Sequence, residues 1–184
     1  MSDIYNAQLA LDTLCRKVSL QQETPPEIDG IDNLPEGSAF WSSNYACLLL
    51  FPVMDCSLDG FQESTAMALD FLDGVLSERE RHNKHADGYL VLALKSKPTD
   101  ELDTAVRTLE LSTNICRKNT IWPENDNKSA SWARISDVSV LGLPDMVARS
   151  SEMLTWPIMS EDVKALWLEI GGDVVQAAGD NNGR

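Results

Sequence analysis

Residues 45–51 read YACLLLF and are followed by Pro52, so a short apolar run ends at a residue that disrupts strand pairing. Residues 89–95, YLVLALK, repeat this pattern after the turn dipeptide Asp87-Gly88. Apolar runs of this length without polar alternation are typical of strands that are buried on both faces. The two runs therefore predict the central strands of a sheet, with parallel pairing as one option.

Around these runs, apolar residues recur at steps of three and four, which is typical of amphipathic helices. Helices are predicted over four ranges: 4–18, 61–81, 99–118 and 160–171. Asp3 is a suitable cap for the first helix and Thr99 for the third. Two further short strands are predicted at 120–122 and 138–141.

Strands that alternate with amphipathic helices predict an α/β fold, and an α+β arrangement stays open. We expect one domain over residues 1–184, with a small mixed sheet of three to four strands packed with about four helices. The Pro- and Gly-rich segment 21–38 is predicted to be a long surface loop and a candidate contact segment. Residues 179–184 are predicted to be a disordered tail.

Charge is unevenly distributed along the chain. Its 184 residues hold 15 Lys and Arg against 29 Asp and Glu, a net charge of −14 that disfavours binding to nucleic acid or anionic membrane. Residues 79–118, however, hold eight basic and six acidic residues. This region is either a solvated helix end or a surface for an acidic partner, while the acidic flanks suit basic partners.

The N-terminal residues, the longest apolar run and the cysteine spacing indicate the cellular compartment. The first residues are acidic and carry no apolar leader, and the longest apolar run, 45–53, is too short to span a membrane. The four cysteines show neither paired nor metal-ligand spacing. We therefore expect a soluble cytoplasmic protein with reduced thiols.

The sequence lacks complete motifs for the catalytic classes considered. The sequence contains no glycine-rich phosphate loop. Asp87 before a strand resembles a metal-dependent nuclease, but Ala93 stands where such a site needs a second carboxylate. His82 and His85 lack a third metal ligand and are expected to be exposed. We predict no catalytic residues, no metal, no cofactor and no enzyme activity, unless another chain completes a shared site.

The end of the third predicted helix is a candidate docking point. Cys116 closes its apolar stripe, and Arg117-Lys118 follow at the end of the helix dipole that favours cations. One interpretation is simple cationic capping of the helix. The other is a partner-binding site, in which Arg117 offers a two-pronged fork to a carboxylate and Trp122 supplies a large apolar anchor.

Residues 87–92 (DGYLVL) and 109–118 (LELSTNICRK) resemble the small middle components of bacterial three-component ABC-ATPase systems, of which Lamassu-type anti-phage systems are members. The resemblance is confined to the centre of the chain. It implies a non-catalytic subunit that bridges an SMC-like ATPase and an effector nuclease, with nucleic acid contacted only through the complex. Four residues match the motif and are expected to bind a partner: Glu110, Cys116, Arg117 and Lys118.

Two other classes of binding protein stay open. An acidic immunity protein or effector chaperone would neutralise a single basic toxin in a tight binary complex. An acidic DNA mimic needs carboxylates spaced like phosphates on one face, whereas here they are scattered among several predicted elements. The bridging subunit is therefore the preferred hypothesis, and the immunity protein is its main alternative.

Overall fold

The computed structural model describes residues 2–31, 34–124 and 131–138. All of the described residues belong to one compact unit, residues 1–145. The second unit, residues 146–184, is not among the described residues. The predicted helix at 160–171, most of the predicted strand at 138–141 and the predicted tail at 179–184 therefore fall outside the described residues.

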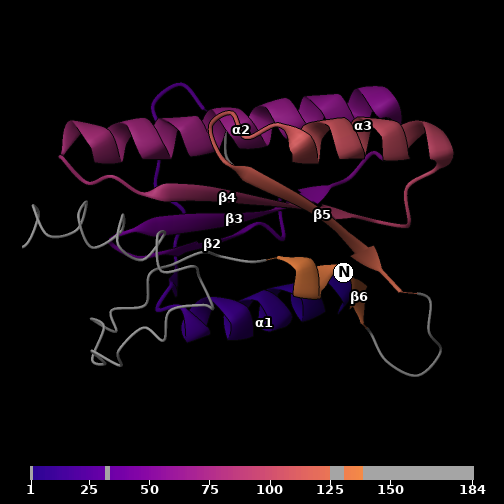
Figure 1. The fold of residues 1–184 in the computed structure, drawn as a ribbon, viewed down its shortest axis with the longest axis horizontal. Coiled ribbons are helices and arrows are strands. Elements are labelled where there is room, and N and C mark those ends of the chain that lie inside the picture. Colours follow the sequence, from indigo (N-terminus) through magenta and orange to yellow (C-terminus); the bar gives the residue numbers. More distant parts are fainter. Residues whose placement is uncertain (1, 32–33, 125–130, 139–184) are drawn as a thin grey trace, which may run out of the picture. The chain divides into compact units, whose positions relative to one another are not determined.

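A mixed sheet forms the centre of the described unit (Figure 1). Its six strands lie in sequence order. The middle three strands run parallel to one another, and the other three pair antiparallel with their neighbours. The strands are β1 Gln21–Glu23, β2 Ala39–Ser42, β3 Ala46–Val53, β4 Asp87–Leu94, β5 Arg117–Pro123 and β6 Trp132–Ala133. The α/β class and the mixed sheet are confirmed, with more strands than the three to four predicted.

Helices cover both faces of this sheet (Figure 1). The helices are α1 Ser2–Lys17, α2 Leu58–Arg81, α3 Asp100–Leu111 and the short 3-10 helix η1 Ile135–Asp137. Helices that join neighbouring parallel strands make right-handed crossovers. When successive strands are added in the same direction across the sheet, these helices therefore lie on the same face. Accordingly α2 and α3, which join β3 to β4 and β4 to β5, share one face, and α1 lies on the other.

The continuous apolar strands are buried on both faces, as predicted. All eight residues of β3 are buried. Leu49 and Phe51 pack into the core beneath α2 and α3, whereas Leu48 and Leu50 pack into the core beneath α1. This alternation follows from the two-residue repeat of a strand, and it explains why the sequence shows no polar positions there.

The N-terminal third differs from prediction in two details. Because α1 begins at Ser2, Asp3 lies inside the helix and not at its cap. Part of the predicted loop 21–38 forms the edge strand β1, which pairs antiparallel with β2. Its residues Gln-Gln-Glu are all exposed, so no hydrophobic pattern marks them as a strand. Elsewhere in this segment, Ile28, Ile31 and Leu34 pack against the core.

The third helix is shorter than predicted. It begins after Thr99, whose side chain caps it as expected, but it ends at Leu111 and not at residue 118. Residues with poor helix propensity follow, and Arg117 to Ile121 pair in parallel with β4. The interpretation of Arg117 and Lys118 as a cationic helix cap is therefore wrong, and Cys116 does not belong to a helical stripe.

Candidate partner-binding site

The segment Ser112–Cys116, here called the α3–β5 loop, is organised by a buried ammonium group. The side chain of Lys118 lies in β5 and is only 5% exposed. Its Nζ donates to the carbonyl oxygens of Ser112 at 3.0 Å, Asn114 at 2.6 Å and Cys116 at 3.0 Å. An ammonium group has three protons to donate, so these bonds match its capacity and fix the loop backbone.

The α3–β5 loop also packs closely onto the start of β4. A Cβ placed on Gly88 would lie 2.9 Å from the Cβ of Cys116 and 3.0 Å from Leu76 Cδ1, which is closer than carbon atoms pack. Burial raises the pKa of the Cys116 thiol to about 11, although nearby Lys118 lowers it. The thiol is therefore protonated at neutral pH and is unsuited to nucleophilic chemistry.

Among the exposed residues on and beside this loop are two large apolar side chains and a cation, which we call the α3–β5 surface: Leu111, Ile115 and Arg117. Leu111 is 84% exposed, more than any other large apolar side chain of the described residues, and Ile115 is 46% exposed. Ile115 has a φ of 68°, a left-handed backbone that a β-branched residue rarely adopts. The loop thus holds an exposed apolar residue in an unfavourable conformation.

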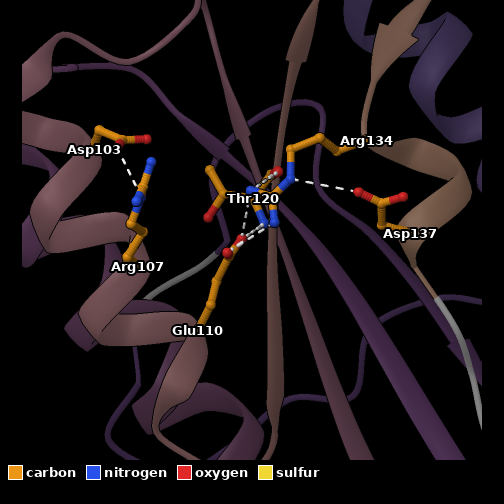
Figure 2. A network of polar contacts seen from close by, with 6 residues as sticks. All are labelled: Asp103, Arg107, Glu110, Thr120, Arg134 and Asp137. Carbon is orange, nitrogen blue, oxygen red and sulfur yellow. Dashed lines mark hydrogen bonds and ion pairs between the residues drawn. The ribbon is translucent and has the colours of Figure 1, made fainter.

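A second polar network joins α3 to the far edge of the sheet (Figure 2). The carboxylate of Glu110 accepts two hydrogen bonds from the guanidinium of Arg134, at 2.9 and 2.8 Å. It also accepts the backbone N–H of Thr120 at 2.8 Å, and Arg134 donates to the Thr120 carbonyl at 3.3 Å. Asp137 lies 3.6 Å from the Arg134 Nε on the opposite side.

The network of Glu110 and Arg134 binds the backbone N–H and carbonyl of Thr120, which a neighbouring strand would otherwise bind. Because β6 pairs only with Trp122 and Pro123, the backbone of Thr120 lies beyond its reach. Arg134 follows β6 with a φ of 63°, which turns the chain away while its side chain reaches back along β5. The ion pair therefore covers the backbone groups of Thr120, which otherwise invite pairing with another chain. Hydrogen bonding to Glu110 raises the pKa of Arg134.

The five residues predicted to bind a partner have different environments. Arg117 is exposed. Trp122 is half-buried and packs against the core, with the Arg134 guanidinium 5.5 Å from its ring centroid. Glu110 is held by Arg134, and both Cys116 and Lys118 are buried. Neither Cys116 nor Lys118 therefore presents a surface to a partner, and of the five, Arg117 is the one with an exposed side chain.

Sequence reasoning missed Leu111, Ile115 and Arg134. Leu111 gave a detectable signal, because it lies two positions after Leu109 and so falls off the apolar stripe of its helix. The backbone of Ile115 and the long-range ion pair of Arg134 leave no mark in local sequence.

The residues considered for metal and nuclease chemistry lie in the described part of the chain. His82 and His85 are both exposed, and residues 2–31, 34–124 and 131–138 hold no group of three or more His, Cys, Asp or Glu placed to bind a metal. Asp87 is exposed at the start of β4, whereas Ala93 is buried near its end. Among these residues, no helix combines the length and apolarity needed to cross a membrane.

Comparisons with protein-family models, with curated proteins and with solved structures find no match to this chain. Its function is therefore argued from its surfaces.

Proposed function

We propose that the chain is a non-catalytic subunit that bridges proteins in a larger assembly, with the α3–β5 surface as one contact. The observation that carries this proposal is the exposed Ile115 at positive φ, on a loop whose carbonyls Lys118 binds. A left-handed conformation costs a residue with a Cβ roughly 1–2 kcal/mol. Such strain persists where the surrounding structure enforces it, and it is concentrated at functional positions.

The charge around this surface indicates the chemistry of its partner. Arg117 is exposed at the start of β5, and Lys84 is exposed shortly before β4, whereas the nearby Arg81 is already paired with Glu78 at 2.7 Å. The contact of the α3–β5 loop with Gly88 places the loop beside the start of that strand. A partner with an apolar recess and nearby carboxylates fits this arrangement, because the Arg117 fork binds carboxylates in two-pronged geometry.

The resemblance to middle components of Lamassu-type systems supports a particular set of partners. The motif residues 109–118 coincide with the end of α3, the α3–β5 loop and the first residues of β5. On this proposal the partners are an SMC-like ATPase and an effector nuclease in the bacterial cytoplasm, and the assembly acts in anti-phage defence.

An immunity protein or effector chaperone is a second candidate function. It is favoured by the acidic exposed side chains of α2, which include Asp59, Glu63, Asp70 and Asp73. A surface of this kind suits a basic toxin. Such a protein forms a tight complex with one toxin and has no use for a second partner.

Co-purification from the native host distinguishes the two functions. We expect the tagged wild-type chain to recover an SMC-like ATPase together with a nuclease. Arg117→Glu and Leu111→Ser should each reduce this recovery, because both change exposed side chains of the α3–β5 surface. Lys97→Glu, an exposed charge reversal elsewhere, is the control and should recover both partners normally.

Recovery that is identical for wild type, Arg117→Glu and Leu111→Ser would contradict the proposal. Recovery of one basic protein in a binary complex would instead support the immunity function. Thermal unfolding of each variant must match that of the wild type, so that a loss of partner is not a loss of fold.

A further inference from the structure

A groove runs between α2 and α3 on the face of these helices that points away from the sheet. It has a volume of about 640 Å³ and extends along the first half of α2 and the whole of α3. The groove is open because the side chains between the helices are small, among them Ala66, Ala105 and Thr108. Leu58, Phe61, Leu69 and Leu109 add apolar surface to the groove, whereas Phe71 and Leu102 pack into the core.

The lining of the groove is mainly apolar, and its flanks are acidic. Residues 58–70 of α2 contain three acidic and no basic residues, and α3 contains four acidic residues against Arg107 alone. Arg107 lies 2.8 Å from Asp103, so its charge is already paired. Glu110 is likewise paired with Arg134, on the side of the sheet edge. The charges that flank the groove are therefore predominantly negative and without a counter-charge in α3.

The shape of the groove matches a helix. A helix of twelve residues such as α3 is about 18 Å long, or roughly three turns. An amphipathic helix places apolar residues at i, i+3 or i+4, and i+7, and thereby fills a groove of this length with one face. A second copy of this chain is disfavoured as the occupant, because its own α2 and α3 carry the same negative charge.

We propose that the α2–α3 groove binds an amphipathic helix of a partner protein, in which basic side chains flank an apolar face. The apolar face contacts Ala66, Ala105 and the other groove residues, while lysines or arginines face the acidic flanks. The groove ends at Ser112, the first residue of the α3–β5 loop, but Leu111, Ile115 and Arg117 do not line it. The inference therefore stands whether or not the α3–β5 surface binds a partner.

A synthetic helical peptide tests the proposal with the full-length chain. The probe is a fluorescent peptide of leucine and lysine, with leucines at helical spacing along one face. One control peptide has the same composition in alternating order, and another replaces lysine by glutamate. We expect the basic amphipathic peptide to bind at least about tenfold more tightly than either control, measured by fluorescence anisotropy.

Variants of the chain locate the binding. Ala66→Trp and Thr108→Trp fill the groove from exposed positions and should each weaken binding at least about tenfold. Ser77→Trp, an exposed position of α2 outside the groove, is the matched control and should bind like the wild type. Leu111→Ser should also bind normally, so a failure of the α3–β5 surface is distinguishable from a failure of the groove.

Three outcomes would overturn the proposal. The first is equal binding of the alternating peptide, which would show that charge alone attracts the probe. The second is unchanged binding to Ala66→Trp and Thr108→Trp in proteins that unfold at the wild-type temperature. The third is self-association of the wild type that Ala66→Trp abolishes, because the groove would then belong to a second copy of the chain.

Discussion

At the scale of single residues, Lys118 is the clearest example of a charged side chain that serves the fold. Its three hydrogen bonds join loop carbonyls that have no strand or helix partner among the described residues. Lys118→Met keeps the length of the side chain but removes all three bonds, although the Asn114 carbonyl still accepts the Cys116 N–H at 2.8 Å. We expect it to lower the free energy of unfolding by about 1–3 kcal/mol, measured by urea denaturation. The exposed Lys97→Met should change it by less than about 0.5 kcal/mol, and equal effects would contradict the assigned role.

Individual residues also mark where prediction from sequence ends. Thr99 was recognisable as a cap, because its hydroxyl bonds the helix N-terminus within the local sequence. The burial of Lys118 was not recognisable, since it depends on a loop folding back over β5. Likewise, Glu110 and Arg134 lie far apart in the sequence, and only the sheet brings them together.

At the scale of elements, the ion pair of Glu110 and Arg134 connects α3, β5 and the segment after β6. We expect Glu110→Ala to lower the free energy of unfolding by about 1–3 kcal/mol, since it removes two hydrogen bonds of the half-buried Arg134 guanidinium and leaves the Thr120 N–H unpaired. Glu63→Ala, an exposed acid of α2, should change it by less than about 0.5 kcal/mol. Chemical denaturation of both variants decides whether the ion pair stabilises the sheet edge.

The elements that the sequence predicted well are those with a local pattern. The strands at 45–51 and 89–95 have continuous apolar runs, and both lie at the centre of the sheet. The end of α3 was misplaced because Cys116 and two cations follow at helical spacing, whereas the pairing of β5 with β4 is a long-range effect. Of the five residues predicted to bind a partner, Arg117 alone has an exposed side chain, and partner binding itself stays a prediction.

At the scale of the whole molecule, the surface of the described unit combines two chemistries. The exposed sides of α2 and α3 carry mostly acidic residues, whereas Arg81, Lys84 and Arg117 are exposed near the starts of β4 and β5. Lys84 and Arg117 are thus exposed cations in a chain whose net charge is −14, whereas Arg81 is paired with Glu78. Opposite charges on separate surfaces allow one small protein to bind two unlike partners, which is what a bridging subunit requires.

The most direct test of the bridging account is Ile115→Asn, with stability and partner recovery measured on the same protein. Asn tolerates left-handed backbone better than Ile does, so relief of strain should raise the free energy of unfolding by up to roughly 1 kcal/mol. The account predicts this rise together with a clear loss of co-purified partner. A variant that recovers its partner like the wild type, or that unfolds more easily, would contradict it.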